Sequence, residues 1–208
     1  MIAIIDYGVG NLFSLQSSFK AIGEEAILTS DAKVIAECGH IILPGVGAFE
    51  DAARKLRETG LGDIVMKEAE KGKPLLGICL GMQLLLESSE EYGLHEGLGL
   101  IKGRNCFIGN VIPKDLKIPH MGWNELIFKG EKHPLFADLS DHEYVYFVHS
   151  YAAFDCEDSQ IAITDYGYPL TAAVGRGNIM GCQFHPEKSG ETGLKILKRF
   201  TQLTKEDL

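Results

Sequence analysis

Cys79 is the residue of this 208-residue chain whose surroundings best suit a nucleophile, at the centre of the sequence GICLG at residues 77–81. An apolar strand pattern precedes it and a helical pattern follows, as in the strand–turn–helix elbow that presents a nucleophile above a sheet. Gly77 and Gly81 would let strand and helix approach, and the N–H groups and dipole at the helix start favour a thiolate. Taken alone, the pattern also fits a buried cysteine that follows a strand.

A possible base for that thiol lies in the sequence FHPEKS at residues 184–189, where the last apolar run ends. In an extended segment residues i and i+2 point the same way, so His185 and Glu187 are expected to project toward one spot. A carboxylate beside an imidazole holds its tautomer and stabilises the imidazolium that forms when the thiol proton is taken. His-Pro-Glu alone equally fits a solvated surface turn, but combined with the elbow it predicts a catalytic triad.

Two glycine-containing loops follow apolar strand patterns. The sequence PGVGAF at residues 44–49 offers backbone N–H groups that, with the N–H of Leu80, could bind an oxyanion. A Gly-rich turn is at least as often a simple connection, and this one lacks the Lys-Ser or Lys-Thr of a P-loop. The sequence DYGVGN at residues 6–11 has two glycines of a dinucleotide loop, but Phe13 replaces the third, which favours a tight turn.

The elements that must position these residues follow two rhythms. Strand patterns at residues 2–6, 41–44 and 75–78 alternate with helical patterns at 12–22, 49–56 and 80–87, which is typical of a parallel sheet buried on both faces. From about residue 98 strand patterns follow one another without helices, at 105–112, 123–128, 144–148, 161–164, 170–174 and 178–184, with a hairpin turn at 175–177. A closing helix carries an apolar stripe of Leu194, Leu197, Phe200 and Leu203. The sequence therefore predicts a single α/β domain spanning residues 1–208, a three-layer sandwich whose central sheet is mainly parallel, with an added antiparallel β layer.

Composition argues against several classes of function. A net charge of −9 argues against nucleic acid as a partner. No apolar run approaches the roughly 20 residues needed to cross a bilayer, and Met1 leads directly into a strand pattern, so a cytoplasmic protein without membrane association is expected. The five cysteines lack CxxC pairs and nearby histidine clusters, which argues against a disulfide framework and against a metal site. No cofactor is predicted.

Taken together, PGVGAF, GICLGMQ and FHPEKS at residues 44–49, 77–83 and 184–189 resemble the class I glutamine amidotransferase family. More narrowly, IIDYGVGN at 4–11, PHMGWN at 119–124 and YFVHSY at 146–151 are similar to the glutaminase subunits of imidazole glycerol phosphate synthase, from histidine biosynthesis. The resemblance implies a flavodoxin-like fold with Cys79 as nucleophile, His185 as general base and acid, and Glu187 as the group that orients it. It also implies that the N–H groups of Gly47 and Leu80 bind the oxyanion.

The resemblance implies L-glutamine as the substrate and a set of residues that hold its amino and carboxylate groups: Gly45, Gln83, Glu91, Ser150 and Tyr151. Two of these also fit plainer interpretations. Gln83 fits an ordinary solvent-facing helix residue, and Glu91 belongs to the acidic run at residues 87–91.

A partner protein is implied as well. Released ammonia would become protonated in water and lose its nucleophilicity, so the resemblance implies a sealed route to a (β/α)₈ cyclase subunit in a heterodimer. Trp123, Asn11 and Lys188 are the interface candidates, although Trp123 fits a partly buried strand aromatic nearly as well. The isolated chain is then expected to be slow, because the loop at residues 45–47 would need the docked partner to reach its working geometry.

Two other functions fit the same motifs. The chain could serve a different synthase, or it could be a degenerate amidotransferase that only binds and regulates a partner. The intact set of Cys79, His185 and Glu187 argues against the second of these.

Overall fold

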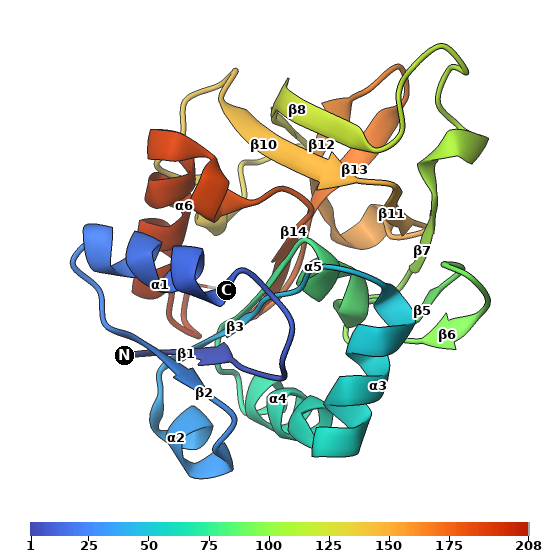
Figure 1. Cartoon of the computed structure of the whole chain (residues 1–208). Helices are drawn as coiled ribbons and strands as arrows, with labels where there is room; N and C mark the ends of the chain where they lie inside the picture. Colours follow the sequence, from blue (N-terminus) through green and yellow to red (C-terminus); the bar gives the residue numbers. More distant parts are fainter. Residues whose placement is uncertain (208) are drawn as a thin grey trace.

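An eight-stranded mixed sheet forms the middle layer of the computed structural model, which describes residues 1–207 (Figure 1). Its strand order is β2-β1-β3-β4-β14-β13-β12-β9. The parallel part consists of β1 (Ile2–Ile5), β2 (Ala26–Thr29), β3 (His40–Leu43), β4 (Leu75–Ile78) and β14 (Ile179–Cys182). The antiparallel extension consists of β13 (Pro169–Arg176), β12 (Gln160–Asp165) and β9 (Ile127–Phe128). The predicted three-layer α/β fold with a mainly parallel central sheet is confirmed.

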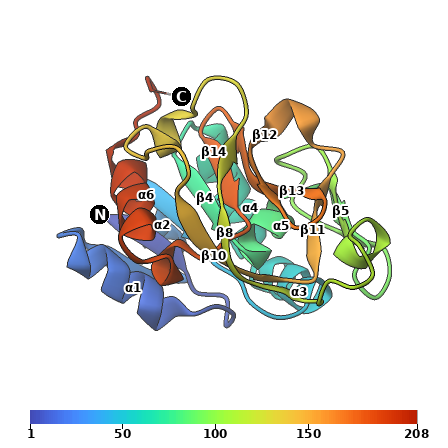
Figure 2. The same cartoon turned by 90° about the horizontal axis from the view of Figure 1, so that it is seen from above.

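Helices cover both faces of this sheet because successive strand side chains point to opposite sides. In β1, Ile2 and Ile4 pack with α1 (Leu12–Ala21) and α6 (Gly190–Gln202), which lie side by side in Figures 1 and 2. Ala3 and Ile5 point to the other face. That face is covered by α2 (Ala32–Glu37), α3 (Phe49–Thr59), α4 (Leu61–Glu70) and α5 (Leu80–Leu85). Within residues 1–207, none of the helices combines the length and apolarity required to span a membrane.

The antiparallel strands do not form the single added layer that the sequence predicted. Part of them extends the central sheet, and the others form two small sheets. One pairs β10 (Tyr144–His149) with β8 (His120–Glu125), and the other contains β11 (Tyr151–Phe154), β7 (Arg104–Phe107), β5 (Ser88–Ser89) and β6 (His95–Glu96). In the second sheet β5 and β7 pair in parallel, whereas the other pairs are antiparallel. The described part of the chain, residues 1–207, also forms four short 3₁₀ helices, at Ile108–Asn110, Pro134–Phe136, Glu157–Ser159 and Pro186–Lys188.

Three predicted elements need correction. The strand expected over residues 105–112 ends at Phe107, because the chain turns there into the 3₁₀ helix Ile108–Asn110. The strand expected over 123–128 is interrupted at the buried Leu126, whose N–H bonds to the Glu143 carbonyl instead of a sheet neighbour. The turn expected at 175–177 lies at residues 177–178, since β13 continues to Arg176.

Gly81 brings strand and helix together at the elbow. A Cβ at this position would lie 1.8 Å from the Leu43 carbonyl oxygen, and one on Gly77 would lie 2.7 Å from the carbonyl carbon of Gly81. Only glycine permits so close a backbone approach. Cys79 therefore lies beyond the carboxyl-terminal ends of β3 and β4.

We expect Gly81→Ala to destabilise the fold by about 3 kcal/mol or more, because backbone atoms rather than a flexible side chain occupy the space a methyl group needs. Urea denaturation followed by circular dichroism measures the change. Gly39→Ala is the matched control, since nothing lies within 4 Å of a Cβ there. Equal stability of the two variants would contradict the packing argument.

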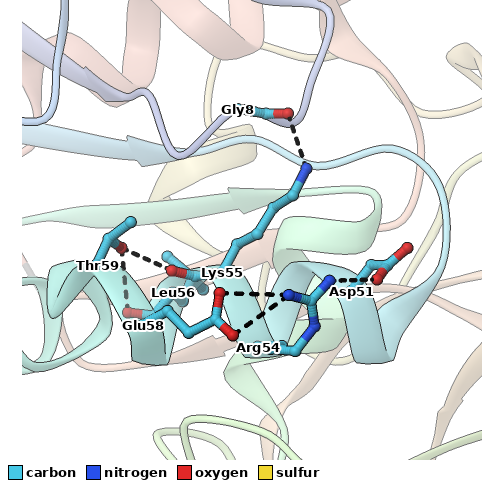
Figure 3. A network of polar contacts seen from close by, with 7 residues as sticks. All are labelled: Gly8, Asp51, Arg54, Lys55, Leu56, Glu58 and Thr59. Carbon is cyan, nitrogen blue, oxygen red and sulfur yellow. Dashed lines mark hydrogen bonds and ion pairs between the residues drawn. The ribbon is translucent and has the colours of Figure 1, made fainter.

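The loop after β1 is a turn held in place by hydrogen bonds. The N–H of Gly8 donates to the Asp6 carboxylate at 3.1 Å, and Lys55 of α3 donates to the Gly8 carbonyl at 3.3 Å (Figure 3). The Tyr7 hydroxyl donates to the Pro44 carbonyl at 2.7 Å. Figure 3 also shows Arg54 between Asp51 and Glu58 on the exposed side of α3. Because the Gly8 N–H is already engaged, the loop favours the tight-turn interpretation over dinucleotide binding.

Candidate active site

Cys79 lies at the junction of β4 and α5 in a strained conformation. Its φ is 54° and its ψ is −111°, a region that residues with side chains rarely adopt and that is often found at functional sites. Its N–H donates to the Cys182 carbonyl of β14 at 2.7 Å. The nucleophile candidate is therefore tied by its own backbone to the neighbouring strand.

His185 and Glu187 follow that neighbouring strand. β14 pairs in parallel with β4, so the segments after the two strands leave the sheet at the same edge. His185 Nδ1 lies 2.8 Å from Glu187 Oε1, and both side chains are almost fully buried. His185 lines the same cavity as Cys79. Two residues 106 positions apart in sequence, 79 and 185, thus meet in one site.

The two side chains meet through a turn rather than through an extended segment, which corrects the predicted local geometry. Glu187 lies in the 3₁₀ helix Pro186–Lys188, and His185 precedes it in extended backbone. The turn is held to β10: the His185 N–H donates to the Tyr146 carbonyl, the Tyr146 N–H donates to the Ser189 hydroxyl, and that hydroxyl donates to the His185 carbonyl. These bonds fix the backbone of His185 and thereby the position of its imidazole ring.

The charge state of His185 reflects its two neighbours. Burial alone would lower the pKa of this imidazole, but hydrogen bonding and charge interactions with Cys79 and Glu187 outweigh burial and raise it to about 9. A protonated imidazole beside sulfur is the form that can give a proton to a leaving group.

We expect the ring of His185 to stay protonated until the pH rises through about 9, and its pKa to fall in a Cys79→Ala variant. Removing the thiol deletes the two interactions with Cys79 that raise the pKa, so only those with Glu187 still oppose the effect of burial. A ¹⁵N NMR titration of the histidine side chains measures both values. Because the folded-state pKa is raised, the stability contributed by this proton is complete below about pH 6.5 and is lost as the pH rises through about 9. A pKa unchanged by the substitution would contradict the pairing.

A cavity of ≈350 Å³ opens above Cys79. Besides the sulfur and the His185 ring, it is lined by Gln83, Glu91, Ser150 and Tyr151, which were all predicted to hold glutamine, and by the predicted oxyanion donors Gly47 and Leu80. Gly45 does not line it: this glycine packs beneath the loop, where a Cβ would lie 2.9 Å from the N–H nitrogen of Gly81. A larger hollow of ≈680 Å³ beside α1 holds neither the thiol nor the imidazole.

Two of the predicted contact residues are held by specific bonds. Gln83 is 5% exposed, so the solvent-facing interpretation of this residue was wrong, and its amide nitrogen donates to the Tyr151 carbonyl and to Gln183 Oε1, each at 3.0 Å. Glu91 accepts the Phe49 N–H at 2.7 Å. The acidic run around Glu91 therefore contributes one carboxylate to the cavity wall.

Sequence reasoning missed Gln183 and the histidine pair of His120 and His149. Gln183 Nε2 donates to Cys79 Sγ at 3.8 Å, and its position two residues before His185 in the same segment was the available signal. His149 lines the cavity and contacts His120 at 2.9 Å, with both rings buried. Both histidines lie within motifs that carried the family resemblance, PHMGWN and YFVHSY.

The predicted interface residues lie around the cavity mouth or at the surface. Trp123 is 53% exposed and meets the edge of the Tyr146 ring, with centroids 6.1 Å apart. The Lys188 ammonium lies 6.0 Å from the centre of the same ring and lines the cavity. Asn11 is half-buried at the start of α1. Trp123 lies on β8 with about half of its surface exposed, which fits both the interface anchor and the partly buried strand aromatic.

Comparisons with known proteins agree with this arrangement. Residues 3–203 match the family described as glutamine amidotransferase class-I. The chain is 53% identical to the imidazole glycerol phosphate synthase subunit HisH of Sulfurimonas denitrificans, covering 97% of this chain and 98% of that protein. It is 52% identical to the protein of the same name from Caldanaerobacter subterraneus subsp. tengcongensis, covering 99% of each.

Solved structures show the same fold at much lower identity. A glutamine amidotransferase crystal structure superposes with a TM-score of 0.74 at 18% identity, covering 97% of this chain and 100% of that one. The PurLQS structure from Thermotoga maritima superposes with a TM-score of 0.73 at 21% identity, covering 97% of each chain. With a family match over nearly the whole sequence and relatives above 50% identity, the chain belongs to the class-I glutamine amidotransferases.

Proposed function

We propose that this chain is the glutaminase subunit of an imidazole glycerol phosphate synthase, hydrolysing L-glutamine to glutamate and ammonia in histidine biosynthesis. The observation that carries the proposal is the meeting of Cys79 and His185 on one cavity, with Glu187 2.8 Å behind the imidazole. The names of relatives above 50% identity that span nearly the full chain support the choice of synthase.

The geometry suits a two-step hydrolysis. Cys79 Sγ attacks the side-chain amide carbon, while the N–H groups of Gly47 and Leu80 stabilise the negative oxygen of the tetrahedral intermediate. His185 gives its proton to the departing nitrogen, which leaves as ammonia, and a glutamyl thioester remains on Cys79. His185 then takes a proton from water, whose oxygen attacks the thioester carbon. Glutamate leaves and the proton returns to the sulfur–imidazole pair.

The remaining cavity residues provide polar groups for the two ends of the amino acid. In this proposal Gln83, Glu91, Ser150 and Tyr151 hold the amino and carboxylate groups of glutamine. Gly45 acts indirectly, by letting the oxyanion loop lie flat against the elbow. Glu187 keeps the proton on His185 Nδ1, so that Nε2 faces the reacting atoms.

The ammonia requires an acceptor, and we propose a (β/α)₈ cyclase subunit that docks as a heterodimer in the cytoplasm. The two relatives named above, both more than 50% identical to this chain, are subunits by name. Trp123, Asn11 and Lys188 are the proposed contacts, and Lys188 connects the cavity wall with the surface aromatic rings. Slow turnover of the isolated chain and faster turnover with the cyclase are expected, because Val46 and Gly47 lie on an exposed loop that docking can reshape.

Labelling with a glutamine-like diazo-ketone tests the function directly. The electrophile should modify Cys79 alone, because the other cysteines do not line the cavity. Mass spectrometry of digested protein locates the label, and excess glutamine should protect the site. Labelling that spreads over several cysteines, or that glutamine does not slow, would argue for a protein without catalytic activity.

The choice of synthase needs a separate experiment. Titrating an imidazole glycerol phosphate synthase cyclase into the glutaminase assay, with and without its nucleotide ligand, should raise glutamate release and yield the imidazole product. Glutaminase activity that this cyclase leaves unchanged would point to a different synthase.

A further inference from the structure

A chain of hydrogen bonds leads away from the cavity wall at His149. His120 and His149 are register partners at the ends of β8 and β10, and His120 Nδ1 lies 2.9 Å from His149 Nε2. On the outer sides, His120 Nε2 lies 2.8 Å from Asn124 Oδ1, and His149 Nδ1 lies 2.9 Å from the Tyr151 carbonyl oxygen. All four ring nitrogens are therefore engaged.

The groups at the two ends fix where the outer protons are. The Tyr151 carbonyl can only accept, so His149 Nδ1 must carry a hydrogen. The Asn124 amide nitrogen donates to the Asp165 carbonyl at 3.0 Å, which identifies its Oδ1 as the acceptor end and places a hydrogen on His120 Nε2. If both rings were neutral, the two inner nitrogens would then face each other with lone pairs only, at 2.9 Å.

We propose that His120 and His149 share one further proton between their inner nitrogens, as a buried imidazole–imidazolium pair whose bond to the Tyr151 carbonyl positions the wall of the glutamine cavity. The pair carries three protons on four nitrogens and one positive charge. The positioning role rests on the proposed glutaminase function, whereas the proton count does not.

Burial opposes such a charge. It lowers the pKa of both rings, that of His149 to about 3 together with the charge of His120. Three features of the site work in the other direction. The inner hydrogen bond becomes charge-assisted, both outer protons meet oxygen acceptors, and His120 stacks on the rings of Phe147 and Tyr166 with centroids 4.9 Å and 4.0 Å away.

The surroundings of the pair contain charges of both signs. Tyr166 contacts His120 from the segment after β12, and His185 lies close enough to repel a charge on His149. The titratable groups that share the cavity with His149 are Cys79, Glu91, Tyr151, His185 and Lys188. A cation here lies beside the sites where glutamine's carboxylate and the oxyanion are expected.

The Tyr151 carbonyl connects the pair to substrate binding. It accepts from both His149 Nδ1 and Gln83 Nε2, at 2.9 Å and 3.0 Å. Two donors fix the direction of this carbonyl and with it the peptide between Tyr151 and Ala152, which directly follows the cavity-lining residues Ser150 and Tyr151. His149 and His120 are accordingly positioning residues, and losing them should raise KM for glutamine more than it lowers kcat.

The proton count can be measured on the chain alone, without glutamine. In ¹⁵N spectra of the imidazoles near pH 7, we expect hydrogens on His149 Nδ1 and His120 Nε2, and inner-nitrogen shifts that report one shared proton. His133 is an internal reference for a neutral ring with its hydrogen on Nε2, the tautomer opposite to that expected for His149, because its Nδ1 accepts the Leu135 N–H. Spectra of His120→Gln and His149→Gln assign the signals. Two neutral rings at pH 7, or a His149 without a hydrogen on Nδ1, would overturn the proposal.

Kinetics of the complex with cyclase test the positioning role. His120→Leu removes the hydrogen bond that holds His149 and should raise KM for glutamine about five- to tenfold, the loss of one hydrogen bond. His120→Gln should restore part of this, since its amide can donate to His149 Nε2. His133→Gln is the control, a partly buried histidine outside the cavity. An unchanged KM in folded His120→Leu overturns the role, whereas an inactive wild type overturns the proposed function and leaves the proton count to stand by itself.

Discussion

A complex containing Cys79→Ala or Cys79→Ser loses glutamine-dependent synthesis by at least about 10³-fold but keeps synthesis from added ammonium salts. Removing a nucleophile deletes the covalent route, and residual hydrolysis depends on the oxyanion site alone. Ammonia supplied from solution does not need the thiol. The measurement is the rate of imidazole product formation with each nitrogen source.

The control for this result is another buried free cysteine. Cys38 lies at the end of α2 and does not line the cavity, so Cys38→Ala should leave both activities near wild type. Loss of both activities in the Cys79 variants would show that this residue maintains the fold rather than attacking the substrate.

Glu187→Gln is expected to lower kcat for glutamine hydrolysis by about 10²- to 10⁴-fold with little change in KM. The amide keeps the size of the carboxylate but loses the charge that stabilises the imidazolium, and it can turn its N–H₂ toward His185 and reverse the tautomer. The same substitution should lower the pKa of His185, because the Glu187 charge is one of the causes of its rise.

A matched substitution separates charge at the site from net charge. Glu191 lies four residues later in the first turn of α6, with its side chain 86% exposed. Glu191→Gln should leave kcat and the pKa of His185 unchanged. If the two variants behaved alike, Glu187 would have no role as the orienting group.

The parallel half of the fold could be predicted because its strands carry the signal in their own residues. β1, β4 and residues 41–43 of β3 are runs of apolar and glycine residues buried on both faces, each followed by a helical pattern. β2 was missed, because it lies at the sheet edge and leaves Ala26 and Leu28 only partly buried. Local sequence patterns also could not predict the place of β14 in the sheet. Its hairpin with β13 is visible in the sequence, but its pairing with β4 joins segments about 100 residues apart.

The site was predictable where a motif combines a reactive group with the backbone that exposes it. Cys79 between two glycines and His185 before a proline are of that kind. Gln183 and His149 carry no such mark, because a glutamine or histidine at the end of an apolar strand is usual in many buried positions. Their roles depend on which atoms lie opposite, such as Cys79 Sγ and His120 Nδ1, and such contacts are set by tertiary packing.

The late entry of β14 into the middle of the sheet has a consequence during synthesis on the ribosome. β4 is synthesised early and can pair with β3, but the backbone groups on its other edge stay unpaired until β14, which begins at Ile179, has been made. Throughout that interval the nascent chain exposes an apolar strand edge that can pair with other chains. In the proposed mechanism, the same delay also withholds efficient glutamine hydrolysis from a nascent chain until His185 and Glu187 have been translated.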